Sequence, residues 1–229
     1  QRRPITAPMD GSPDLTTAPF RDARYAPRRL DIERRDDGSL VLANPTPFAT
    51  TFLTTLDALD RWSVETPDRV WLAERDGAGW RTVTYAEAAQ QVAALAGGLK
   101  GLGLKRSDCL LILARNGVDH ALISYATMSL GAAVAPVSPQ YGLAGADLSR
   151  LAYACGVLKP DAVYTDDAAA FAGALEAEFL KGLPVVASAN ARPADVRFAD
   201  LLKRAPTQSV ARPDDIAKLR HLYRPPDAA

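Results

Sequence analysis

Cysteine and histidine are both scarce in this sequence, which holds two of each among 229 residues. Cys109 and Cys155 lie in different apolar segments, form no Cys-x-x-Cys pair and have no histidine at ligand spacing. The sequence therefore predicts no metal-binding residues. Buried, reduced thiols are the simpler interpretation of both cysteines, and they fit a cytoplasmic location.

A net charge is also absent, because 27 lysine and arginine residues balance 27 aspartate and glutamate residues. Without an overall field, nucleic-acid binding is not expected. The most apolar stretch, residues 121–137, is interrupted by Gly131 and Pro136, and it is better interpreted as a buried helix followed by a strand than as a membrane span. The first residues lack the apolar core of a secretory signal. We therefore expect neither a membrane nor a nucleic acid as a partner.

The amino-terminal part predicts an arm followed by a hairpin. Residues 1–27 are polar and rich in proline, which is typical of an irregular arm. Residues 29–44 alternate apolar and polar side chains on both sides of Asp37 and Gly38, a pair that favours a tight hairpin turn. We expect the main domain to extend over residues 28–219.

A helix, a second hairpin and a longer helix are predicted next. Residues 52–69 place leucines at helical spacing and reach a helix-ending proline at Pro67. Residues 70–85 read as two strands joined by a glycine-containing turn. Thr84 and Glu87 then have the spacing of a capping box, which predicts that a helix begins there.

The second half alternates short apolar runs with helical segments. Cys109 to Ala114 is a continuous apolar run, typical of a strand covered on both faces. Beyond it the pattern predicts helices at 116–129, 148–154 and 168–180. These alternate with strands at 132–137, which is buried, and at 162–165 and 184–187. This order favours an α/β fold, in which a parallel sheet carries helices on both faces and β-hairpins precede it.

No phosphate-binding glycine loop is found. The glycine cluster at 97–106 ends a helix rather than opening one, so its amides point the wrong way for phosphate. The spacing of Gly98, Gly101 and Gly103 does not fit G-x-G-x-x-G, and Leu104 stands where a P-loop needs lysine. A nucleotide-binding α/β module is therefore kept only as an alternative.

The start of the helix at 116–129 is a candidate ligand contact. Asn116 is a candidate N-cap, and Asp119 and His120 lie in the first turn, where a helix attracts anions. The structural alternative is that Asp119 complements the helix dipole while His120 packs. His221 has no partner at a recognisable spacing.

Three blocks, residues 66–104, 111–143 and 158–167, resemble the amino-terminal part of the adenylate-forming acyl-CoA synthetases. The stretch W-R-x-V-T-Y-x-E from Trp80 is general to that superfamily. The stretches N-G-V-D-H-A-L from Asn116 and A-P-V-S-P-x-Y from Ala135 are more particular to its aryl branch. The resemblance as a whole is closest to feruloyl-CoA synthetases. The similarity covers about Pro45 to Leu219, and it implies the first, parallel-sheet subdomain of the large amino-terminal domain of such an enzyme.

The resemblance also implies an activity. These ligases activate a carboxylic acid, here an aromatic one, with ATP and magnesium and then transfer the acyl group to coenzyme A. Ser138 and Pro139 match a block near the entry of coenzyme A and are the candidate cofactor contacts. The alternative is that both residues only form a tight turn after a buried strand.

The end of the sequence departs from the family. A Ser/Thr/Gly-rich loop ending in Pro-Lys should follow Leu219, but residues 220–229 read RHLYRPPDAA. We interpret 220–229 as an aberrant tail, the product of a frameshift, because one shifted reading of GC-rich codons for this stretch gives Thr-Ser-Thr-Gly.

Without the loop, the triphosphate has no platform, so we expect an inactive fragment with no catalytic residues and no tightly bound cofactor. A non-catalytic interaction or regulatory module derived from the same fold is the second hypothesis.

Overall fold

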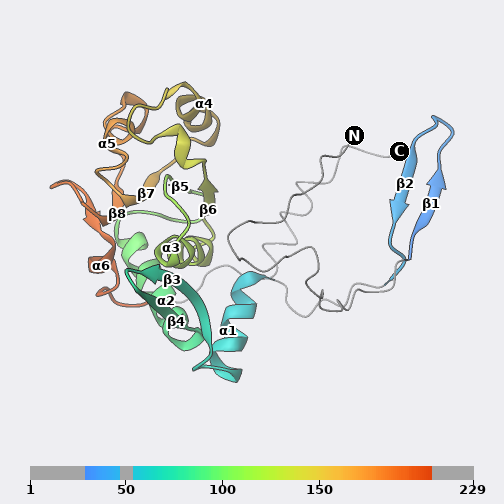
Figure 1. Cartoon of the computed structure of the whole chain (residues 1–229), viewed down its shortest axis with the longest axis horizontal. Helices are drawn as coiled ribbons and strands as arrows, with labels where there is room; N and C mark the ends of the chain where they lie inside the picture. Colours follow the sequence, from blue (N-terminus) through green and yellow to red (C-terminus); the bar gives the residue numbers. More distant parts are fainter. Residues whose placement is uncertain (1–28, 47–53, 208–229) are drawn as a thin grey trace, which may run out of the picture. The chain divides into compact units, whose positions relative to one another are not determined.

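The computed structural model describes residues 29–46 and 54–207. The chain divides into two units, Gln1–Thr50 and Thr51–Ala229 (Figure 1). The arm predicted over 1–27, the tail at 220–229 and His221 lie outside the described residues. Each unit is considered by itself below.

The first unit contains the predicted hairpin. Strands β1 (Asp31–Arg34) and β2 (Leu40–Ala43) are antiparallel, with Ile32 opposite Leu42. Gly38 takes a φ of 83°, a left-handed conformation that glycine adopts without strain. The prediction of a turn at this position is therefore confirmed.

The second unit begins with a helix, a hairpin and a longer helix, as predicted. Helix α1 (Thr55–Glu65) buries Leu56 and Leu59. Strands β3 (Val70–Asp76) and β4 (Gly79–Thr84) pair in antiparallel fashion. Helix α2 (Tyr85–Gly101) starts at the predicted capping box, in which Thr84 and Glu87 each bond to the other's backbone N–H.

A five-stranded parallel sheet forms the centre of this unit, in the order β6-β5-β7-β8-β9. Its strands are β5 (Cys109–Ile112), β6 (Ala133–Pro136), β7 (Ala162–Asp167), β8 (Val185–Ala189) and β9 (Val196–Arg197). The predicted α/β architecture is therefore confirmed. The short strand β9 extends the sheet beyond the strands that the sequence predicted.

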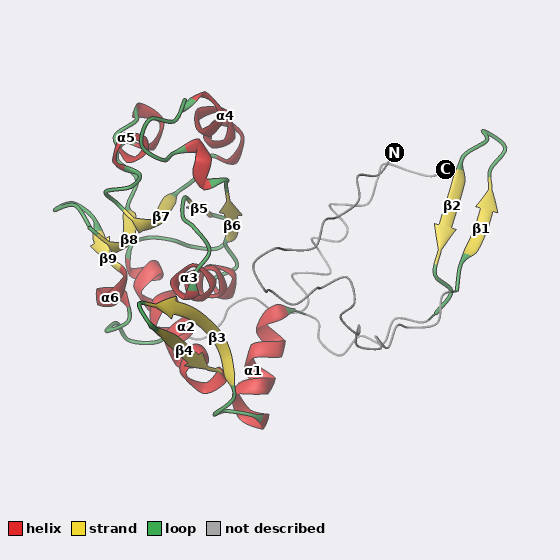
Figure 2. Cartoon of the chain, viewed as in Figure 1, coloured by secondary structure: helices red, strands yellow, loops and turns green. Residues whose placement is uncertain are grey.

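Helices cover both faces of the sheet (Figure 2). Helices α2, α3 (Val118–Ser129) and α6 (Phe198–Leu201) pack on one face, around Leu110, Ile112 and Tyr164. Helix α4 (Ser149–Leu158), helix α5 (Ala172–Leu175) and the 3-10 helices η1 (Pro139–Tyr141) and η2 (Glu178–Leu180) lie on the other, around Leu111 and Val163. The alternation of side chains along each strand produces these two cores.

Two sequence predictions were wrong in detail. The helix predicted over 168–180 is replaced by α5 and η2, because Ala177 between them takes an extended conformation that interrupts the helix. Strand β6 was predicted to be buried, but Ala133 and Pro136 are exposed because β6 is an edge strand.

The glycine cluster at 97–106 lies at the end of α2, as the sequence predicted. Gly103 has a φ of 98° just past the helix. Gly97 and Gly98 have a packing role that the sequence did not reveal. A Cβ on Gly97 would lie 2.0 Å from the carbonyl oxygen of Ala205, and one on Gly98 would lie 2.8 Å from the side chain of Leu201.

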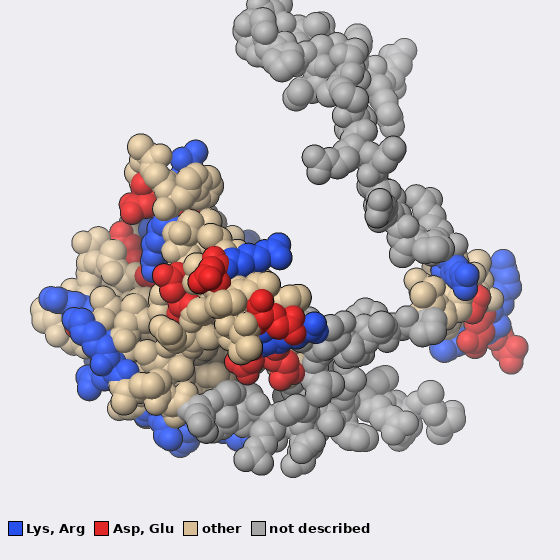
Figure 3. Space-filling model, turned by 90° about the horizontal axis from the view of Figure 1, so that it is seen from below, with Lys and Arg blue, Asp and Glu red and all other residues tan. Residues whose placement is uncertain are grey.

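Other expectations from composition also agree with the structure. Cys109 and Cys155 are buried free thiols. No helix in the described parts of the chain is long and apolar enough to cross a membrane. Figure 3 shows acidic and basic side chains next to one another on the face it presents.

Candidate functional site

The carboxyl ends of the parallel strands place several polar residues at one edge of the sheet. The chain passes from β5 to β6 on one side, and then by way of α4 to β7 on the other side of β5. The connections therefore diverge between β5 and β7. In open α/β sheets, such a switch point leaves a crevice outside the carboxyl ends of the strands, where ligands commonly bind.

A cleft of about 180 Å³ lies at this switch point. Arg115 and Asn116 follow β5, Asp166 lies near the end of β7, and Ser188 lies on β8. Asp119 and His120, from the first turn of α3, and Glu74, from β3, also line it. The cleft thus brings together the two residues that the sequence singled out at the start of α3.

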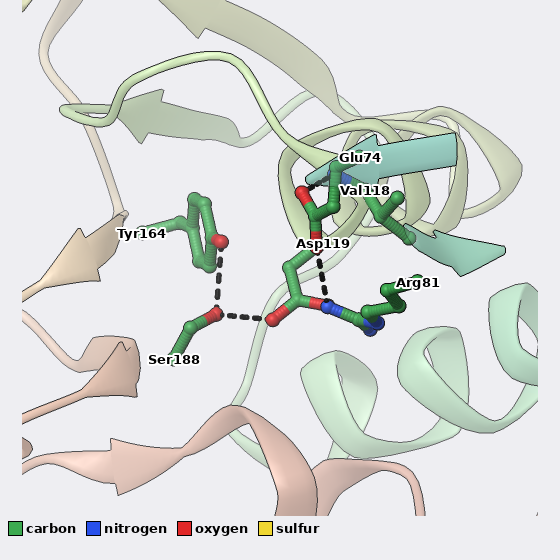
Figure 4. A network of polar contacts seen from close by, with 6 residues as sticks. All are labelled: Glu74, Arg81, Val118, Asp119, Tyr164 and Ser188. Carbon is green, nitrogen blue, oxygen red and sulfur yellow. Dashed lines mark hydrogen bonds and ion pairs between the residues drawn. The ribbon is translucent and has the colours of Figure 1, made fainter. Parts of the chain in front are cut away.

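Glu74 and Arg81 tie the hairpin β3–β4 to the start of α3 (Figure 4). One carboxylate oxygen of Glu74 accepts a hydrogen bond of 2.8 Å from the backbone N–H of Val118. Its other oxygen lies 2.9 Å from Nη1 of Arg81. The second Nη of Arg81 lies 2.5 Å from Oδ1 of Asp119. The guanidinium therefore joins the carboxylate of Glu74, on β3, to that of Asp119, in the first turn of α3.

A chain of hydroxyl groups continues the network into the sheet. Ser188 donates a hydrogen bond of 2.7 Å to Oδ2 of Asp119, because an ionised carboxylate can only accept. The Ser188 hydroxyl has one proton, so Tyr164, 2.9 Å away, must be the donor to Ser188. Tyr164 is completely buried, and this burial raises the pKa of its hydroxyl far above the ordinary value. The phenol therefore stays protonated and acts as a donor.

These contacts decide how the helix start is used. The sequence predicted Asn116 as the N-cap, but the N-cap is Gly117, which has no capping side chain. Glu74, on strand β3, supplies the cap instead. The carboxylate of Asp119 lies in the first turn and is also engaged. The two internal carboxylates disfavour an added phosphate here by repulsion. The structural interpretation of Asp119 is thus the better one.

The remaining polar groups of the cleft are also largely engaged. Arg115 donates to Asp166 over 2.6 Å, which raises the pKa of the Arg115 guanidinium. The other oxygen of Asp166 is buried and has no hydrogen-bond partner. Nδ1 of His120 lies 3.2 Å from the carbonyl oxygen of Arg115. Among the described residues no cluster of potential ligands could hold a metal ion.

Ser138 and Pro139 lie at the same edge of the sheet, after β6. Ser138 is the residue that precedes η1, and Pro139 is its first residue. The amide of Tyr141 bonds to the carbonyl oxygen of Ser138, so the segment forms a tight turn. Both side chains are partly exposed. They do not line the cleft at the switch point.

A comparison with protein families adds an independent finding. The model of the family described as AMP-binding enzyme matches residues 59–220. The match covers most of the chain and includes β3 to β9. None of the curated proteins compared with the chain matches it.

Solved structures share the fold. The chain superposes on an acyl-CoA synthetase from Brucella canis with a TM-score of 0.58 and 17% identity, over 67% of this chain and 28% of that one. It superposes on an acetoacetyl-CoA synthetase from Streptomyces lividans with a TM-score of 0.57 and 23% identity, over 68% of this chain and 25% of that one. For a benzoate CoA ligase from Burkholderia xenovorans the TM-score is 0.54 and the identity 18%, over 68% of this chain and 29% of that one. The chain thus spans less than a third of the length of these three proteins.

Proposed function

Because the chain belongs to the AMP-binding enzyme family, we propose that it forms the first part of an acyl-CoA ligase for an aromatic carboxylic acid. The complete enzyme would use ATP and magnesium to form an acyl-adenylate and would then transfer the acyl group to coenzyme A. The family match over residues 59–220 carries the ligase assignment. The stretches from Asn116 and from Ala135, which resemble the aryl branch of the superfamily, support an aromatic acid.

Ser138 and Pro139 are proposed to contact coenzyme A. The turn that holds them follows the carboxyl end of β6 and leaves both side chains partly exposed, so a ligand can approach. The main domain is proposed to comprise residues 28–219, preceded by the arm at 1–27 and followed by the tail at 220–229. Free buried thiols support a cytoplasmic location.

The 229-residue chain alone is proposed to be inactive and to bind no cofactor tightly. Residues 1–229 contain no Ser/Thr/Gly-rich run that ends in Pro-Lys. In-line attack on ATP requires groups that hold the triphosphate, and the described part of the chain offers no free helix start for it at the switch point.

An exchange assay tests this proposal directly. The purified chain should give no ferulate-dependent exchange of pyrophosphate into ATP above a control without acid. A complete ligase purified by the same procedure serves as the positive control. Robust exchange by the 229-residue chain would contradict the proposed inactivity.

The coding sequence after codon 219 tests the assignment to a ligase. We expect a shifted frame that encodes a loop ending in Pro-Lys and several hundred further codons. Joining residues 1–219 to that product should restore exchange with ferulate, and with benzoate more weakly. Non-coding DNA in every forward frame, or a restored enzyme that ignores aromatic acids, would contradict the proposal.

A further inference from the structure

Helix α4 has a second apolar face, which points away from the sheet. Leu151 and Cys155 are buried against the core, whereas Tyr153 and Val157 are 76% and 66% exposed. The outer side of a surface helix is normally polar. In α4, by contrast, Arg150 is the only charged residue. The composition of this outer face therefore calls for an explanation.

The outer face of α4 forms one wall of an open groove of about 500 Å³. Tyr141, from η1, lies on the groove together with Tyr153, Val157 and Leu158. Small-molecule sites typically measure about 300–1,000 Å³ and combine apolar and aromatic walls with a few polar groups. The α4 groove has both the size and the composition of such a site.

Arg150 is the cationic group of the groove. Its guanidinium carbon lies 5.8 Å from the ring centroid of Tyr141. The neighbouring carboxylate of Asp147 accepts hydrogen bonds from the N–H and the hydroxyl of Ser149, at 3.0 and 2.8 Å. Within residues 29–46 and 54–207, no ion pair joins Arg150 to a carboxylate. Hydrogen bonds from Ser149 and, more weakly, the charge of Arg150 lower the pKa of Asp147, but Arg150 forms no ion pair with this carboxylate, so its planar donors are available to an anion from outside.

We propose that the α4 groove binds a small aromatic anion. The aromatic ring would lie against Tyr141 and Tyr153, and the anionic group would accept paired hydrogen bonds from Arg150. Stacking of aromatic rings and forked arginine–anion contacts have compatible geometries, because both the ring and the guanidinium are planar. Val157 and Leu158 supply the apolar floor.

This binding site is distinct from the switch-point cleft. The groove lies on the face of the sheet covered by α4, whereas the cleft is lined by α3 and β3. A groove with one cation beside two aromatic rings complements a small planar anion, because the rings offer stacking faces and the guanidinium offers paired donors. The inference does not depend on the proposed ligase function.

Titration of the 229-residue chain tests the proposal. The probes are 2-naphthoate, 2-naphthyl phosphate, the neutral alcohol 2-naphthalenemethanol and the non-aromatic cyclohexanecarboxylate, each followed by isothermal titration calorimetry. We expect naphthoate to bind at least tenfold more tightly than the alcohol and than cyclohexanecarboxylate. Tighter binding of naphthyl phosphate than of naphthoate would identify the anion as a phosphate, and the reverse order would identify a carboxylate. Either order supports the site.

Variants locate the site. Arg150→Gln should weaken naphthoate binding at least tenfold, and Arg150→Lys should weaken it less because the charge remains. Tyr153→Ala should weaken binding several-fold without affecting the fold, because that side chain is mostly exposed. Arg204→Gln, an exposed arginine outside the groove, is the matched control and should leave binding unchanged.

Three results would overturn the proposal. One is the absence of naphthoate binding at millimolar concentration. Another is equal binding by the Arg150→Gln variant and the unaltered chain. The third is a dimer in analytical ultracentrifugation that Tyr153→Ala converts to a monomer, because a second copy of the chain would then occupy the groove.

Discussion

The carboxylate of Glu74 caps helix α3 by accepting a hydrogen bond from the N–H of Val118, 44 residues further along the chain. A helix start leaves several N–H groups without partners inside the helix, and a nearby side chain normally serves one of them. Here Gly117 has no side chain to do so. The hairpin β3–β4 therefore caps a helix that is distant from it in the sequence.

Replacing Glu74 with alanine should lower the free energy of unfolding by about 1–3 kcal/mol, because a buried N–H and the Arg81 guanidinium both lose a charged partner. Chemical denaturation measures the effect. Glu65→Ala is a matched control, since Glu65 pairs with Arg61 on the surface, where the Glu65 side chain is 46% exposed and the Arg61 side chain 42% exposed. Its cost should stay below about 1 kcal/mol. Equal losses for the two variants would contradict the capping role.

The hydroxyl chain from Tyr164 through Ser188 to Asp119 should behave as a coupled unit. Ser188→Ala removes the acceptor of a buried phenol and should cost about 1–3 kcal/mol. The double variant Tyr164→Phe/Ser188→Ala should cost less than the sum of the two single changes, because no phenol is then left unpaired. Denaturation of all four proteins in one cycle measures the coupling. Strict additivity would show that the two hydroxyls act independently.

Tyr164 should also make stability depend on pH in alkaline solution. Burial, the largest cause, and the nearby carboxylates of Asp119 and Asp166 raise the pKa of the folded-state hydroxyl. The unfolded chain therefore releases the proton first, at about pH 10. The stabilisation is complete below that pH and is lost as the pH rises above it. Tyr164→Phe should remove this component of the pH dependence in thermal unfolding followed at pH 9 and pH 11.

Glycines in two helices should respond to alanine in opposite directions. In α2, Gly97→Ala places a Cβ 2.0 Å from the carbonyl oxygen of Ala205, so it should cost about 1–3 kcal/mol. In α4, a Cβ on Gly156 meets nothing within 4 Å, so Gly156→Ala should gain about 0.5–1 kcal/mol from its better helix propensity. Thermal denaturation of both variants gives the comparison. A stabilised Gly97→Ala variant would rule out the close contact.

The two thiols should be slow to react in the native chain. Cys109 and Cys155 are 8% and 5% exposed, and burial raises the pKa of each thiol. Since the thiolate is the reactive form, a disulfide reagent at pH 8 should modify both cysteines many-fold more slowly than in denaturant. Rapid modification of either residue without denaturant would show that its segment opens readily.

Local patterns predicted most of the fold. The alternation around Asp37 and Gly38, the capping box at Thr84 and the apolar run from Cys109 each specify an element from neighbouring residues alone. The order of strands and helices then favoured a parallel sheet, because parallel strands need crossover connections. These signals are contained within about 20 residues or fewer, which is the range over which helix caps and strand alternation act.

The candidate site could be predicted only in part. Asp119 and His120 were identified from their place at a helix start, but Glu74, Arg81 and Ser188 carry no local signal that links them to it. Their contacts join residues 7 to 69 positions apart. The strand pairing that brings them together also made β6 an edge strand, which its apolar sequence did not reveal.

Strand β6 gives the sheet a protected border against self-association. Ala133 and Val137 donate their N–H groups toward β5, and because the direction alternates along a strand, positions 134 and 136 face outward. One of these is Pro136, which has no N–H, and only Val134 within the four-residue strand can donate to an incoming chain. An added strand would therefore find one N–H donor along this edge, beside the carbonyl oxygens of Val134 and Pro136. Short edges that end on proline are one way in which proteins avoid growing into fibrils.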